Sequence, residues 1–165
     1  MSSRSKTYAT ESDIKRFEDI KRLYLQARQY SKTKPKKERE QQETKHIEAF
    51  LLLTVILEGT LVNLALKLLE KRTDLNALYD KRRKRYDYDN VFNDLYLLRE
   101  VSTSEFKKLE KFRMKRNEYI HNLLSEDTKI VENKVIRIYR EYRGLVWTMI
   151  NKFRKSIGKI KKITI

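Results

Sequence analysis

Arg116, Asn117 and His121, close together in the second half of the chain, have the types and spacing for phosphate chemistry. Histidine transfers protons near neutral pH, and arginine supplies a fixed charge whose fork geometry suits phosphate oxygens. RNA cleavage needs a base for the 2′-hydroxyl, a cation for the charge developing at phosphorus and an acid for the leaving 5′-oxygen. Arg116 and His121 are therefore candidate catalytic residues, and Asn117 is a candidate to hold the imidazole or the scissile phosphate.

These residues lie in a predicted helix that begins at the capping-box pattern of residues 102–105. On a helical wheel of residues 104–124, the apolar side is defined by Leu109, Phe112, Tyr119, Ile120 and Leu123. Arg116 falls inside this arc, and Asn117 and His121 lie on its border. A buried guanidinium needs a partner. The structural alternative is that Arg116 bridges to Glu58 or another acid and that His121 is an ordinary boundary histidine.

The rest of the chain supplies helices to position this segment. The 165 residues include only three glycines and one proline, which favours long helices with short connections. Apolar stripes predict a first helix capped near Thr10, a long second helix from about Glu38 to Arg72, a third from Asp89 or Asn90, and a last helix with a regular three-four repeat. Residues 31–37 and 73–90 are the predicted breaks, the second containing a short helix.

The expected fold is an all-α, up-and-down antiparallel bundle of four to five helices. One domain spans residues 1–165, with a frayed N-terminus (1–10) and a basic C-terminal tail (158–165). In the second helix, residues 49–69 are apolar on nearly every face. A membrane span needs roughly 20 predominantly apolar residues. Because Glu58, Gly59 and Asn63 interrupt this run and its flanks are charged, we expect a core helix with an extra face at a dimer interface, and no membrane.

The net charge of +16 indicates a polyanionic partner. Nucleic acid is the first candidate, an anionic membrane surface is the second, and a general lysine bias is the alternative. The densest basic cluster is Lys81, Arg82, Arg83, Lys84 and Arg85, followed by Tyr86. These residues are candidate RNA contacts, with phosphates on the cations and a base on the ring. The alternative is a solvated loop that keeps the protein soluble.

The amino-acid composition also excludes several kinds of chemistry. With no cysteine, the chain has no disulfide, thiol nucleophile or thiolate metal site. The acids near His121 show no metal-ligand spacing, so we expect no metal and no cofactor. The first residues lack an apolar core, so we expect no secretory signal and a cytoplasmic location. Because one helix offers one Arg–His set, two copies facing each other across a homodimer axis would provide both an acid and a base.

Residues 112–122, Phe-Arg-Met-Lys-Arg-Asn-Glu-Tyr-Ile-His-Asn, resemble the Arg, polar residue, then His signature of the HEPN superfamily (higher eukaryotes and prokaryotes nucleotide-binding). That family consists of small helical bundles, many of them metal-independent ribonucleases of toxin–antitoxin, antiviral and CRISPR systems that dimerise around a composite site. The resemblance implies that Arg116, Asn117 and His121 are active-site residues and that Glu58 is a polar neighbour. One branch carries a tyrosine two residues after the histidine, where this chain has Leu123.

The resemblance therefore implies a homodimeric, metal-independent endoribonuclease, a toxin or antiviral effector with a possible antitoxin or defence-complex partner. Two other hypotheses remain open. The same fold could bind RNA or DNA without catalysis, through residues 81–85 and the tail, with Arg116 structural. It could also be an accessory subunit whose helices pack on a partner protein.

Overall fold

The computed structural model describes residues 9–32, 45–123 and 125–158. Every regular element in these ranges is helical, which confirms the predicted all-α fold. The elements are α1 (Glu11–Ser31), α2 (Lys45–Glu70), the 3-10 turn η2 (Thr73–Leu75), α3 (Asn76–Lys84), α4 (Tyr88–Leu97), α5 (Thr103–Asn122) and α6 (Thr128–Ser156). Most of the predicted frayed N-terminus and basic tail lies outside the described residues.

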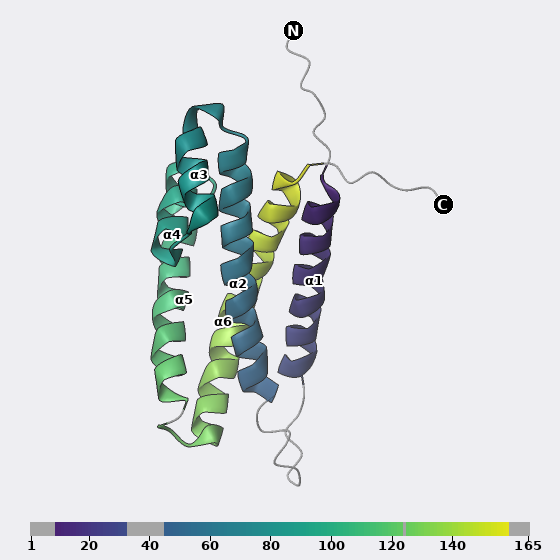
Figure 1. Ribbon diagram of the computed structural model, residues 1–165. Coiled ribbons are helices and arrows are strands. Elements are labelled where there is room, and N and C mark those ends of the chain that lie inside the picture. The colour runs from purple at the N-terminus through teal and green to yellow at the C-terminus, as the bar shows by residue number, and fades with distance from the viewer. Residues whose placement is uncertain (1–8, 33–44, 124, 159–165) are drawn as a thin grey trace, which may run out of the picture.

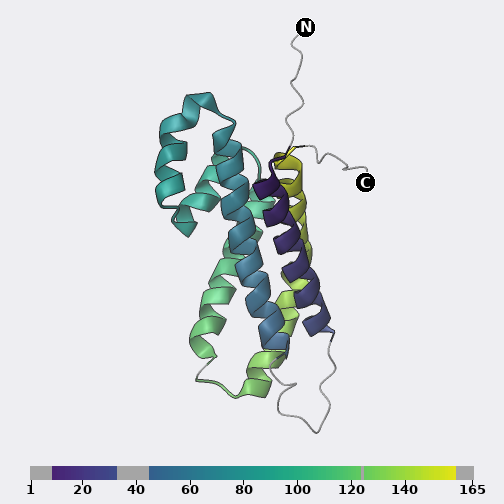
Figure 2. The ribbon, with the colours of Figure 1, turned by 45° about the vertical axis from the view of Figure 1, so that its right-hand side comes forward.

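Four long helices, α1, α2, α5 and α6, run alternately in opposite directions and form the body of the molecule (Figure 1). α2 packs most extensively on α6, and α1 and α5 flank this pair on opposite sides (Figures 1 and 2). The short helices α3 and α4 stack beside one end of α2, near the start of α5 (Figure 2). The candidate segment therefore lies on an outer helix of the bundle.

Side-chain caps fix several helix ends where the sequence predicted them. Thr10 and Asp13 form a capping box at α1, and Ser102 and Glu105 form another at α5. Asp127 caps α6 by accepting a hydrogen bond from the backbone N–H of Lys129. Polar residues at these points satisfy amide groups that a helix start leaves unpaired.

The core follows the apolar repeats. The predicted stripe of the last helix is Val131, Val135, Ile138, Tyr142, Leu145, Met149 and Phe153, and all but the partly buried Leu145 are in the core. α2 supplies the opposing surface with fully buried leucines at 53, 57, 61 and 64. Trp147 lies off the stripe and contacts Tyr24 of α1, so α6 uses a second face for packing.

α2 is described from Lys45 to Glu70, and its predicted start at about Glu38 lies outside the described residues. Two other boundaries differ from expectation. The basic run is mostly helical, because lysine and arginine are good helix formers and α3 continues to Lys84. α4 begins at Tyr88, with Asp87 at the N-cap position, rather than after Asp89 or Asn90. With α3 and α4 both present, the described chain has six α-helices rather than four or five.

Candidate functional site

The Arg116 guanidinium lies between two polar partners on the surface of α5. Its Nη1 donates to Asn117 Oδ1 at 3.0 Å, and its Nη2 is 3.6 Å from Glu58 Oε2 on α2. The side chains of Arg116 and Glu58 are 31% and 41% exposed. The helix thus turns Arg116 inward, as the wheel predicted, but leaves its charge accessible to solvent. A loose, half-exposed ion pair of this kind leaves the guanidinium able to bind an anion.

His121 lies one helical turn beyond Asn117, near the end of α5. It is exposed, and among the described residues neither an ion pair nor a hydrogen bond fixes its imidazole. Asn117 is also exposed, and its amide oxygen accepts a hydrogen bond from Arg116 rather than from His121. The three motif residues therefore follow one another along α5 with their polar groups open to solvent, and the imidazole is free to approach a bound substrate.

Two residues that the sequence did not single out complete the surroundings of Arg116. Arg113, one turn earlier on α5, forms an ion pair with Asp89, and Tyr88 begins α4. Both line a hollow of about 10 Å³ together with Glu58 and Arg116. Burial, reinforced by the Glu58 carboxylate, raises the pKa of the Tyr88 phenol well above its usual range. The phenol therefore stays protonated at neutral pH and remains a hydrogen-bond donor.

A hollow of this size holds about one water molecule and no nucleotide. The described residues that line this hollow in a single chain therefore do not enclose a nucleotide beside Arg116. A substrate bound there would be enclosed on one side only, unless another molecule covered it.

An apolar face of α2 lies beside this motif. Five positions with a three-four spacing share the face: Leu52, Val55, Gly59, Val62 and Leu66. Val55 is 60% exposed, the other four are half-buried, and a Cβ atom added to Gly59 would meet nothing within 4 Å. Glu58 borders the face, so the Arg116–Glu58 pair lies at its edge. By length and composition α2 is also able to cross a membrane, although over half of its most apolar window is buried in the bundle.

The basic run divides into two groups. Arg82 and Tyr86 both hold the buried Asp94 of α4: Arg82 Nε and the Tyr86 hydroxyl each donate to Asp94 Oδ2 at 2.8 Å. Burial and this carboxylate raise the pKa of Tyr86 well above its usual range. These two side chains tie α3 to α4, which the sequence did not indicate, and the ring of Tyr86 is half-buried rather than open for stacking.

The other four residues of the run are exposed. Arg83 lies 3.7 Å from Asp80 and Arg85 lies 3.3 Å from Asp87, both in solvent. Lys81 and Lys84 have no ion-pair partner among the described residues. Of the six candidate RNA contacts, these four therefore carry charge available to phosphate. Lys81 and Lys84 are the most available, because no acid among the described residues pairs with them.

The second histidine is enclosed. His46 Nδ1 of α2 lies 3.1 Å from Glu132 Oε1 of α6, with side chains 12% and 9% exposed. A histidine held between two core helices ties them together and has little access to a large substrate. His121 remains the histidine that a nucleic acid can reach.

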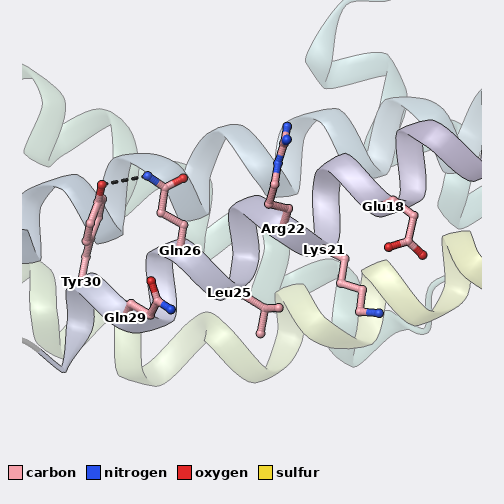
Figure 3. Close-up of a pocket in the computed structure, with 7 residues that line it drawn as sticks. All are labelled: Glu18, Lys21, Arg22, Leu25, Gln26, Gln29 and Tyr30. Atoms are coloured by element: carbon pink, nitrogen blue, oxygen red, sulfur yellow. Dashed lines mark hydrogen bonds between the residues drawn. The ribbon is translucent and has the colours of Figure 1, made fainter.

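A hollow of about 540 Å³ lies along α1 and contains none of the candidate residues (Figure 3). Its side chains spread over one helix surface: Lys21 and Arg22 point in different directions, and Gln26 donates to the Tyr30 hydroxyl at 2.8 Å (Figure 3). Groups that diverge in this way do not converge on one reacting atom, so the hollow is not a second candidate active site.

No protein-family model matches the sequence, and searches of curated proteins and of solved structures gave no match. The resemblance of residues 112–122 to the HEPN signature therefore stays a prediction.

Proposed function

We propose that this protein is a metal-independent endoribonuclease of the HEPN type, acting as a homodimer with a composite active site. One arrangement supports the proposal more than any other. A solvent-accessible arginine, an amide and an exposed histidine follow one another on α5, next to an uncovered apolar face of α2. In the cell, such an enzyme would be a toxin or antiviral effector controlled by an antitoxin or defence-complex partner.

The reaction needs no group outside the protein. His121 takes the proton of the RNA 2′-hydroxyl, and the oxygen attacks the adjacent phosphorus. The P–O bond to the 5′-oxygen breaks, which leaves a 2′,3′-cyclic phosphate on one product. His121 of the partner subunit gives a proton to the departing 5′-oxygen. Arg116 binds the phosphate oxygens while negative charge develops on them.

Dimerisation explains why a single chain carries an incomplete site. An exposed apolar face on a soluble bundle indicates a binding surface. Packing the α2 faces of two copies would bring both Glu58 carboxylates, and the two Arg116 side chains beside them, toward the two-fold axis. The α5 motif at the edge of this face would then gain the second wall that the single chain lacks.

The charge of the protein suits the substrate. A net charge of +16 attracts RNA from a distance and makes binding depend on salt. Lys81 and Lys84 on α3 are exposed cations that are available for phosphate contacts. We propose these two, with Arg83 and Arg85, as RNA contacts, and give Arg82 and Tyr86 the task of holding α3 against α4.

One observation favours a second candidate function. Arg116 faces an acid, as a purely structural bridge would require. Under this alternative the protein is a non-catalytic, HEPN-like RNA-binding or interaction module of a defence or toxin–antitoxin complex. His121 would then have no role in activity.

A cleavage and binding assay separates the two functions. End-labelled RNA is incubated with the protein in EDTA, and cleavage and affinity are measured on the same samples. The proposed enzyme cleaves, His121→Ala binds without cleaving, and the control Lys108→Ala, an exposed change on the same helix, cleaves normally. Binding without cleavage by the unmodified protein, over a panel of structured and unstructured RNAs, would support the alternative module.

A further inference from the structure

A second basic surface lies on the side of the bundle away from α5, where α1 crosses α6 (Figures 1 and 2). A groove of about 260 Å³ runs between the two helices there. It is lined by Tyr24, Leu25, Arg28, Arg143 and Trp147. Aromatic rings, an aliphatic side chain and two guanidinium groups thus line one shallow depression, and none of its lining residues is acidic.

The aromatic part of the groove is held in place. The rings of Trp147 and Tyr24 are 5.0 Å apart between centroids and tilted by 34°. The Tyr24 hydroxyl donates to the backbone carbonyl of Arg143 at 3.2 Å, which fixes the tyrosine against α6. Trp147 is nevertheless 37% exposed. A tryptophan that is supported from below and open to solvent is a platform for a stacking base, because every base has a π-face.

The two guanidinium groups of the groove are available to bind anions. Arg28 and Arg143 have no carboxylate partner among the described residues, in contrast to Arg82, Arg113 and Arg116. α6 continues the line of charge, with Arg140 and Arg137 exposed at three-residue steps from Arg143. A row of unpaired guanidinium groups beside a stacking platform matches the alternation of phosphate and base along a single strand.

The hollow along α1 extends the same surface. Leu25 lines both the hollow and the groove, and Lys21 and Arg22 lie beyond it on α1 (Figure 3). We infer that the α1–α6 groove binds single-stranded RNA, with a base stacked on Trp147 and the flanking phosphates on Arg28 and Arg143. This inference rests on the proposed RNA partner but not on cleavage at the α5 motif.

Trp147 is the only tryptophan of the chain, so its fluorescence reports on this groove directly. The probe is a fluorescein-labelled oligouridine with 2′-O-methyl groups, which cannot be cleaved by 2′-hydroxyl attack. An unlabelled copy is expected to quench the Trp147 emission with the same dissociation constant that anisotropy of the labelled copy gives. Trp147→Leu should weaken binding about tenfold, whereas Trp147→Phe, which keeps an aromatic face, should retain most of the affinity.

The electrostatic part is tested by salt titration. Arg143→Ala is expected to lower the slope of log affinity against log salt by about 0.7, the contribution of one contact on a single strand. The Arg143 contact with Tyr24 uses its backbone carbonyl, so this change leaves the helix packing intact. Lys107→Ala, an exposed change of equal charge on α5, should leave the quenching of Trp147 unchanged.

Each unexpected result of the fluorescence and anisotropy assays leads to a different conclusion. Anisotropy that shows RNA binding without a change in Trp147 emission would overturn the groove inference and leave the proposed ribonuclease standing. A change in emission with phosphatidylserine vesicles but not with RNA would identify the groove as a membrane contact. Emission that depends on protein concentration alone would identify it as a contact between copies. An absence of RNA binding in both assays, together with intact RNA, would overturn both proposals.

Discussion

Arg116 of α5 and Glu58 of α2 face each other with Nη2 and Oε2 3.6 Å apart, and both side chains remain partly open to solvent. A pair in this position contributes little to stability, about 0–1 kcal/mol. The same pair lies at the edge of the apolar face of α2, and the exposed His121 follows Arg116 on α5. Because this ion pair is weak as a structural bridge, the Arg116 guanidinium remains available to bind an anion.

The first prediction concerns this pair. Arg116→Ala should lower the free energy of unfolding by less than about 1 kcal/mol but reduce the RNA cleavage rate by at least about 100-fold, the effect of losing a charge-stabilising donor. Arg116→Lys should also be impaired, because an ammonium lacks the fork that binds two phosphate oxygens. Chemical denaturation and single-turnover cleavage provide the two values. Stability and cleavage falling together would instead identify Arg116 as structural.

The second prediction concerns the apolar face of α2. Val55→Asp places a carboxylate on that face and should convert a homodimer into monomers, with cleavage lost at the same time because the site is composite. Leu97→Asp is the matched control, since Leu97 is 77% exposed at the end of α4, away from the face. Sedimentation velocity measures the change in mass. A Val55→Asp protein that remains dimeric and active would place the dimer contact elsewhere.

The third prediction separates the structural and RNA-binding parts of the basic run. Asp94→Ala leaves Arg82, whose side chain is 14% exposed, without its partner and should cost about 3–5 kcal/mol of stability. Lys84→Ala should leave stability within about 0.5 kcal/mol of the original and weaken RNA binding. Urea denaturation and RNA titration test the two effects. Equal loss of stability in both variants would rule out this division of roles.

The fourth prediction concerns acid. Burial by itself raises the pKa of Asp13, but hydrogen bonds from Lys67 and Thr10 more than offset it, so its pKa lies below the ordinary 3.8. Lys67 Nζ is 2.7 Å from Asp13 Oδ2. A carboxylate with a lowered pKa in the folded state stabilises the protein above the unfolded-state pKa, and this contribution disappears as the pH falls through the folded-state pKa.

Unfolding free energies measured from about pH 6 downward should therefore decline below about pH 4. The decline should be shallower in Asp13→Asn, which has no carboxylate to protonate. Asp80→Asn, an exposed change on α3, is the control and should keep the original profile. Profiles of equal steepness in all three proteins would contradict the assigned role of Asp13.

Much of the framework could be predicted because it depends on local pattern. The capping boxes at Thr10 and Ser102 and the stripe of α6 follow from spacings of three and four residues, which a single helix dictates. The inward turn of Arg116 follows from the same periodicity. Its contact with Glu58 was one of the structural alternatives that the sequence left open, and the structure places the two side chains together.

The remaining features depend on how the chain folds back on itself. Arg82 and Asp94 are twelve residues apart and meet only because the chain turns back between α3 and α4, so a run that reads as a solvated loop contains a buried ion pair. Tyr88 lies near Arg116 because α4 contacts α5. The α1–α6 groove combines Tyr24 with Trp147, residues from opposite ends of the chain, and no periodicity within one helix indicates such a pairing.

The most direct test of the central claim is the chemistry of the RNA ends after incubation with the protein in EDTA. If His121 activates the 2′-hydroxyl, mass spectrometry of the upstream product will show a 2′,3′-cyclic phosphate, and His121→Ala will yield intact RNA. A 3′-hydroxyl product, cleavage that appears only when Mg²⁺ is added, or RNA that stays intact with the unmodified protein would contradict the account.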